Sequence, residues 1–141
     1  METKKSSLPL TFFLVSLFIF FFSILFDAFY VDKTPSEFSA FSALLLGWAY
    51  LGGPGISWVG NVFLWISYLF ILKRRTKTSA VLSFIAVSFM LSFLFFDTTI
   101  VSENNFEEKI TGYGLGYYMW LSSGFIILIG SLYLTFKKNL N

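Results

Sequence analysis

The sequence predicts an all-α membrane protein, an antiparallel bundle of four transmembrane helices, because long uncharged apolar stretches alternate with short charged segments of opposite sign. Its 141 residues are 56% hydrophobic and 13% charged, about half the charged fraction of a soluble domain. Eight of its ten Lys and Arg residues lie at positions 4–5, 73–77 and 137–138, and seven of its eight acidic residues lie at positions 27–37 and 97–108. Basic segments favour the cytoplasmic side of a membrane. We therefore expect one membrane domain over residues 1–141, with both termini cytoplasmic.

The first apolar stretch, residues 8–26, predicts a span over about residues 8–30. Its 19 residues rise about 28 Å as a helix, close to the hydrocarbon thickness of about 30 Å. Lys4 and Lys5 ahead of it are also typical of a secretory signal. However, the stretch is longer than a signal-peptide core, and the sequence after Phe26 offers no small-x-small cleavage site. We expect it to be retained as a span.

The second stretch is too long to be a single span. Residues 38–72 contain no charge, and 35 residues in one helix would measure about 52 Å. Pro and Gly interrupt helices, so Gly52-Gly53-Pro54-Gly55 predicts a break. Residues 56–72 then form the second span. Residues 38–51 form an extra half-helix, interfacial or re-entrant on the outer side, since a further crossing there would invert every later charged segment.

The third and fourth spans follow without such complications. They are expected at residues 80–96 and 115–136, joined to their neighbours by a basic turn and by an acidic outer loop over residues 97–112. Connections this short place consecutive helices side by side and antiparallel.

The composition excludes most catalytic and metal chemistry. The chain has no Cys and no His, so thiolate sites, thiol redox chemistry and the commonest general base are missing. We expect no enzyme activity, no cofactor and no metal; an enzyme would have to rely on carboxylates such as Asp97 and Glu107. The spans lack the midplane ionisable residues typical of ion pathways, including the first-span Glu of small multidrug transporters. The basic residues orient the chain in the membrane, so no nucleic-acid partner is expected.

Polar and aromatic residues cluster at the outer ends of the second and fourth spans. They recur every three or four residues and so share helix faces; they are Ser57, Asn61, Trp65, Tyr113, Tyr117, Trp120 and Ser123. One interpretation is interhelical packing, in which Asn61 hydrogen-bonds a side chain of the fourth span, with Tyr113, Tyr117 or Ser123 as candidates. The alternative is an outward-facing pocket floored by Asn61.

Acidic residues form a candidate outer surface beside that cluster. They are Asp97, Glu103, Glu107 and Glu108. A solvated acidic loop explains them, although three glutamates could also supply oxygen ligands to a divalent cation.

Several strings resemble those of an uncharacterised family of small four-span bacterial inner-membrane proteins. These strings are residues 46–58, 91–94, 110–114, 116–118, 120–121 and Ser123, and the resemblance covers roughly residues 44–131. It implies a multi-pass protein of the bacterial inner (plasma) membrane and brings no activity with it.

Two functional hypotheses follow from these exclusions. The first is a non-enzymatic inner-membrane protein that binds a partner, as an accessory subunit or as an immunity-like protein that neutralises a membrane-active toxin. Its partners would be the lipid bilayer and another membrane protein, or further copies of the chain in a homo-oligomer. The alternative is a small carrier or ligand-binding protein with a pocket between the second and fourth spans.

The charge pattern makes a direct prediction about topology. Alkaline phosphatase, which is active outside the cytoplasm, will be inactive when fused after Asn141, whereas a green fluorescent protein fused there will fluoresce. The reason is that short-loop Lys and Arg set orientation. Strong phosphatase activity of this fusion would contradict the assignment, and a fusion after Gly112 serves as the matched control that should be active.

Overall fold

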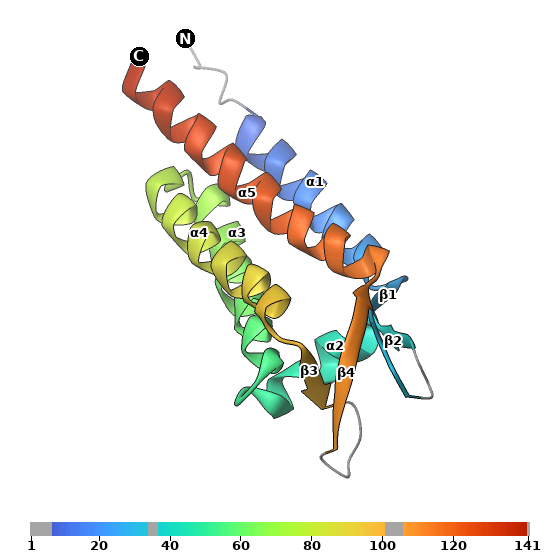
Figure 1. Ribbon diagram of the computed structural model, residues 1–141. Helices are drawn as coiled ribbons and strands as arrows, with labels where there is room; N and C mark the ends of the chain where they lie inside the picture. The colour runs from blue at the N-terminus through green and yellow to red at the C-terminus, as the bar shows by residue number, and fades with distance from the viewer. Residues whose placement is uncertain (1–6, 34–36, 101–105, 141) are drawn as a thin grey trace.

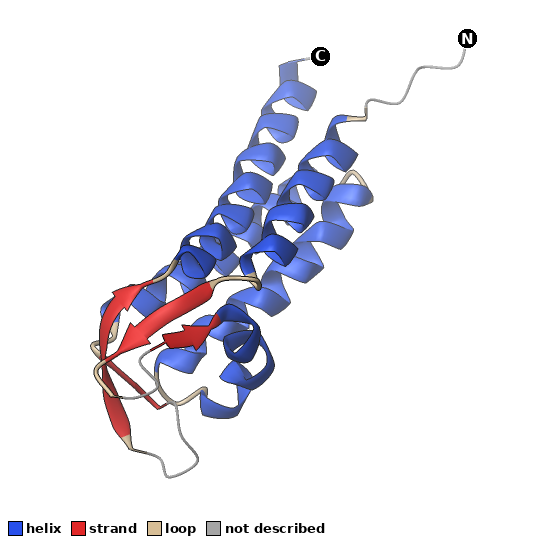
Figure 2. Ribbon diagram, turned by 90° about the vertical axis from the view of Figure 1, so that its right-hand side faces the viewer, coloured by secondary structure: helices blue, strands red, loops and turns tan. Residues whose placement is uncertain are grey.

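The protein is mostly helical, with a four-stranded antiparallel sheet at one end (Figures 1 and 2). The computed structural model describes residues 7–33, 37–100 and 106–140. Four helices lie side by side: α1 (Leu8–Ser23), α3 (Val59–Leu72), α4 (Thr76–Ser92) and α5 (Leu115–Leu140). α1 packs along α5, α5 along α4, and α4 along α3. The start of α1, the end of α5 and the α3–α4 turn lie at the end opposite the sheet (Figure 1).

Three helical stretches are long and apolar enough to cross a membrane. They are Pro54–Leu72, Thr76–Phe95 and Leu115–Leu140. α1 is apolar but has 16 residues, fewer than a typical span of about 20. The structure thus supports membrane crossing by composition and length for three of the four predicted spans.

The polarity of the bundle suits a lipid environment. Seven serines on the helices are fully buried: Ser16, Ser23, Ser67, Ser79, Ser83, Ser123 and Ser131. Large apolar side chains instead point outward, among them Phe18 at 68% and Phe84 at 62% exposure. Small residues let helices approach closely in lipid. Apolar side chains gain nothing there by packing between helices, because the lipid tails are equally apolar. A soluble protein rarely exposes apolar patches this large.

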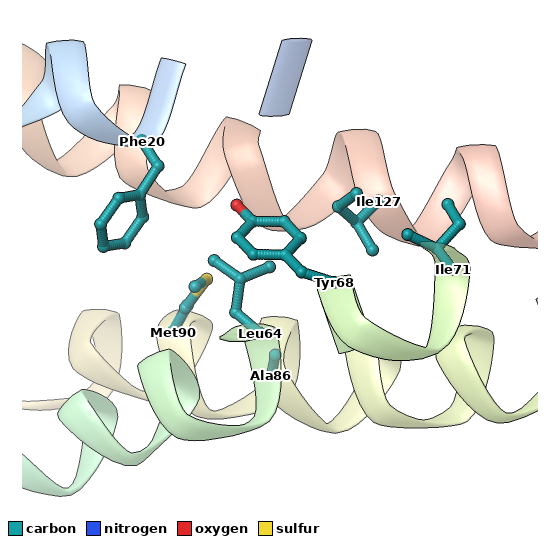
Figure 3. Close-up of a cluster of buried hydrophobic side chains, with 7 residues drawn as sticks. All are labelled: Phe20, Leu64, Tyr68, Ile71, Ala86, Met90 and Ile127. Atoms are coloured by element: carbon teal, nitrogen blue, oxygen red, sulfur yellow. The ribbon is translucent and has the colours of Figure 1, made fainter. Parts of the chain in front are cut away.

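Hydrogen bonds between helices join the buried serines. Ser16 Oγ donates to the carbonyl of Ser123 at 2.7 Å and lies 2.8 Å from the Tyr68 hydroxyl. Ser79 Oγ similarly contacts the carbonyl of Ser67 and the Ser131 hydroxyl, at 3.0 and 2.8 Å. The apolar core shown in Figure 3 is formed by Phe20, Leu64, Tyr68, Ile71, Ala86, Met90 and Ile127.

The sheet corrects the all-α prediction. Its strands are β1 (Asp27–Val31), β2 (Glu37–Ser39), β3 (Thr98–Ile100) and β4 (Glu107–Tyr113), in the order β2-β1-β4-β3. The predicted first span over residues 8–30 was therefore too long, because the helix ends at Ser23 and the chain turns into β1. The acidic segment predicted as a loop contains β3 and β4. β-branched and aromatic residues in these segments fit strands that pack on one face.

Two glycines allow close backbone packing where the sheet joins the bundle. A Cβ at Gly114 would collide with the carbonyl oxygen of Asp27, and a Cβ at Gly116 would lie 2.8 Å from the same atom. The amide of Gly114 donates to the carbonyl of Ala28 at 2.8 Å. The end of α1 and the start of α5 are thus in direct backbone contact, and β1 and β4 continue from them as paired strands.

The predicted break in the second apolar stretch is confirmed. α2 (Ala40–Leu46) continues as the 3₁₀ helix η1 (Gly47–Tyr50), and after a turn at residues 51–53 a second 3₁₀ helix, η2 (Pro54–Trp58), leads into α3. The half-helix expected at residues 38–51 begins later, at Ala40, because residues 38–39 belong to β2 and Ser39 caps the helix. The fourth helix begins where predicted and extends to Leu140, and the last 3₁₀ turn of the third, η3, spans Phe93–Phe95.

The glycine contact between α1 and α5 generates a stability prediction. Gly114→Ala will lower the free energy of unfolding by about 1–3 kcal/mol, the usual range for overpacking, because its Cβ meets backbone that must shift. Gly112→Ala is the matched control, since its Cβ would meet its nearest atom at an ordinary 3.6 Å. Equal stability of the two variants, measured by reversible unfolding in mixed micelles, would contradict this account.

Candidate functional site

A cavity of about 300 Å³ lies between the bundle and the structures at its sheet end. Its walls come from the end of α1, the inner side of the sheet, the segment from α2 to η2, and the first turns of α3 and α5. Aromatic side chains dominate the lining: Phe20, Phe29, Phe38, Tyr50, Trp58, Phe93, Tyr117 and Trp120. Within the described part of the chain, no charged residue lines it. The cavity therefore suits an uncharged, mostly apolar molecule.

Asn61 is the most deeply buried amide of this site. It lies in the first turn of α3 and is 2% exposed. Its Oδ1 accepts a hydrogen bond from the indole Nε1 of Trp120 on α5 at 2.7 Å. An indole nitrogen can only donate, so the oxygen of the amide must face Trp120 and the NH₂ group must point elsewhere.

The expected interhelical hydrogen bond of Asn61 is present, but its donor differs from the three candidates. The Tyr117 hydroxyl donates to the carbonyl of Met90 at 3.0 Å, and Ser123 Oγ donates to the carbonyl of Trp120 within its own helix at 2.6 Å. Tyr113 lies in β4, beyond the helix, and packs against Phe93. Trp120, whose indole faces α3, is the donor instead.

The NH₂ group of Asn61 is open to the cavity. The one side-chain hydrogen bond of Asn61 uses Oδ1. Among the described residues, no side-chain nitrogen or oxygen is fully enclosed without a hydrogen-bond partner. Asn61 is 2% exposed and lines the cavity, and from this we infer that the small accessible part of Nδ2 borders that space. It offers two N–H donors to a ligand.

Most other polar groups that line the cavity already form hydrogen bonds within the protein. Ser57 Oγ donates to the carbonyl of Pro54 at 2.8 Å, Ser23 Oγ to the carbonyl of Phe20 at 2.6 Å, and Trp58 Nε1 to the carbonyl of Leu44 at 2.7 Å. Thr99, on β3 and 8% exposed, is a further polar residue of the lining. It lies in the sheet, on a strand that contacts η2.

The structure divides the predicted polar and aromatic cluster. Ser57, Asn61, Tyr117 and Trp120 line the cavity, whereas Trp65, Tyr113 and Ser123 do not. Trp65 is 41% exposed and packs edge-on against Phe20 and Trp58. Sequence reasoning predicted the half-helix that contains α2 but not that it lines the cavity, and it missed the wall formed by the sheet because it did not predict the strands. The β-branched run Thr98-Thr99-Ile100 was the available signal.

The predicted acidic surface lies on and beside the strands. Asp97 and Glu107 are exposed, Glu108 is half-buried, and Glu103 lies outside the described residues. Among the residues that the structure describes, no group of three or more His, Cys, Asp or Glu is arranged to hold a metal ion. Burial raises the pKa of the Tyr113 hydroxyl, and the nearby negative charge of Asp97 raises it further. Tyr113 is therefore a neutral side chain at physiological pH.

Comparisons of the chain with protein-family models, curated proteins and solved structures find no match. The resemblance to small four-span bacterial proteins stays a prediction, and the site has to be interpreted from its geometry.

The Trp120–Asn61 contact predicts a measurable contribution to folding. Asn61→Leu will lower the free energy of unfolding by about 0.6–1.7 kcal/mol, the range for hydrogen bonds between membrane helices, because it leaves the indole N–H unpaired. Trp65→Phe is a control on the same helix, where an exposed ring is replaced. An unchanged or increased stability of Asn61→Leu would show that this hydrogen bond does not hold α3 to α5.

Proposed function

We propose that the protein is a four-span integral membrane protein that binds a small neutral ligand in the cavity at the outer end of its bundle. The observation that carries the proposal is the Asn61 amide, 98% buried yet with N–H donors facing an apolar cavity. An acceptor bound at this amide would add a hydrogen bond worth about 0.5–1.5 kcal/mol and so stabilise the protein. This supports the ligand-binding alternative over the partner-binding hypothesis favoured by the sequence alone.

The membrane arrangement supports calling this end the outer one. Lys73, Arg75, Lys77, Lys137 and Lys138 all lie at the end opposite the sheet (Figure 1). The positive-inside rule then places the sheet and the cavity outside. α1 packs along α5 and exposes Leu14, Phe18 and Phe21, each at least 51%. We infer that α1 crosses the same apolar layer, with a thinner local bilayer accommodating its length.

The dimensions and chemistry of the cavity define the class of ligand. An engineered cavity of about 150 Å³ accepts benzene, so one of about 300 Å³ suits about a dozen non-hydrogen atoms. The lining favours an apolar body, and the Asn61 donors favour a carbonyl, ether or hydroxyl oxygen. An ionised ligand would be left without a counter-charge in the described wall, which is costly in a buried site.

A terminally brominated nonanol tests this proposal with the protein in lipid nanodiscs. Bromine quenches tryptophan fluorescence on contact, and Trp58 and Trp120 both line the cavity. We expect saturable quenching by bromononanol. Asn61→Leu will weaken its binding by about fivefold, equivalent to one hydrogen bond of about 1 kcal/mol, and will leave the binding of bromononane unchanged.

A cavity-filling variant provides the matched control for partition into lipid. Ala43 lines the cavity, whereas Leu45 on the same helix is 53% exposed and does not. Ala43→Phe should abolish the saturable component, and Leu45→Phe should keep it. Quenching that grows linearly with bromononanol, to the same extent in all variants, would reject the binding site.

A further inference from the structure

One wall of the cavity is the apolar segment Ala40–Tyr50, which combines α2 and η1, and we infer that the cavity opens there through a mouth at Leu46 and Ala49. We propose that the ligand reaches the cavity through this mouth from the outer leaflet of the membrane, and that it is therefore a lipid-soluble neutral amphiphile. The proposal rests on the ligand-binding function proposed above and adds the route and the source of the ligand.

The segment is apolar on both sides. Its cavity side includes the small residues Ala40, Ala43 and Gly47 and also the larger Leu44 and Tyr50. On its other side, Phe41, Leu45 and Trp48 are 51%, 53% and 58% exposed. A helix in contact with water would carry polar residues on that side. The whole stretch over residues 38–72 is uncharged, so the outer face of the segment has the chemistry of a lipid-facing surface.

Exposure identifies the mouth. In the described part of the chain, Leu46 and Ala49 are exposed, whereas the other residues that line the cavity are buried or half-buried. Leu46 is 53% exposed, and its neighbours Trp48 and Leu51 are 58% and 43% exposed. A molecule from water would have to cross this apolar rim first. Trp is enriched at the membrane–water interface, which places the rim at the level of the outer leaflet.

The segment is anchored so that it lies over the cavity. The Ala40 amide donates to the carbonyl of Phe26 at 2.9 Å, which ties the start of α2 to the end of α1. In the middle of the segment, the carbonyl of Leu44 accepts a hydrogen bond from Trp58 Nε1 at 2.7 Å. Backbone contact between Gly55 and Gly47 leaves no space for a side chain. The lipid-facing side and the cavity-lining side of this segment are therefore fixed with respect to the bundle.

Photocrosslinking tests the environment of the mouth. Benzoylphenylalanine introduced at Leu46 or Trp48 in protein reconstituted in phosphatidylcholine vesicles should form lipid adducts detectable by mass spectrometry. Phe84, 62% exposed on α4, is the positive control, and Phe106, 65% exposed before β4, is the control expected to face water. Protein–protein adducts at Leu46 and Trp48 would mean that a second copy covers the mouth, and no adduct at either would mean that it faces water. Either result would overturn the proposal.

Binding kinetics test the route. Bromononanol preloaded into vesicles should quench wild-type fluorescence in a saturable phase, and Leu46→Glu should slow that phase by about tenfold because a charge at the rim opposes a lipid-borne molecule. Leu45→Glu places the same charge on the same helix but outside the cavity lining, so it is the matched control and should keep the wild-type rate. An unchanged rate in Leu46→Glu would reject the lateral route while leaving the cavity as a binding site. Absence of the saturable phase in the wild-type protein would reject the binding function itself and the route with it.

Discussion

The constraint on which this structure depends is that polar groups removed from water need hydrogen-bond partners. The bundle meets it with serines, each placed where its hydroxyl reaches a backbone carbonyl or another hydroxyl of a neighbouring turn or helix, as Ser16 and Ser79 do. These short side chains also let the helices pack closely. The Asn61 amide has only half of its hydrogen bonding within the protein. Its oxygen accepts from Trp120, and its nitrogen faces the cavity. The same rule that explains the bundle therefore points to the site.

The cavity exists because of how the sheet is attached. Gly114 and Gly116 bring the end of α1 against the start of α5, so β1 and β4 leave the bundle as a paired unit. The segment from α2 to η2 must then pass beneath the sheet before α3 begins. It does so with Ala40, Ala43 and Gly47 facing inward, and these residues are too small to fill the space. Close packing at the glycines thus leads to loose packing next to them.

The sequence predicted the features that depend on local chemistry. The Gly-Gly-Pro-Gly break, the positions of the last three long helices and the burial of Asn61 follow from backbone restrictions, apolar run length and the cost of an amide in lipid. The sheet was not predicted, because strands as short as Glu37–Ser39 and Thr98–Ile100 become stable only when paired with distant segments. For the same reason, the first helix was predicted to continue to residue 30. The donor to Asn61 was missed because the choice between Tyr117 and Trp120 depends on helix rotation, which spacing does not specify.

The central claim is that a ligand acceptor completes the hydrogen bonding of Asn61 inside the cavity. The most direct measurement is an experimental structure of the protein in lipid nanodiscs with bromononanol, in which anomalous or cryo-EM density locates the ligand. The account predicts an elongated density among Phe29, Trp58 and Trp120, with its oxygen within about 3.2 Å of Asn61 Nδ2. An empty cavity at saturating ligand, or a cavity closed by Trp120 rotating onto α2 with Asn61 paired elsewhere, would contradict it.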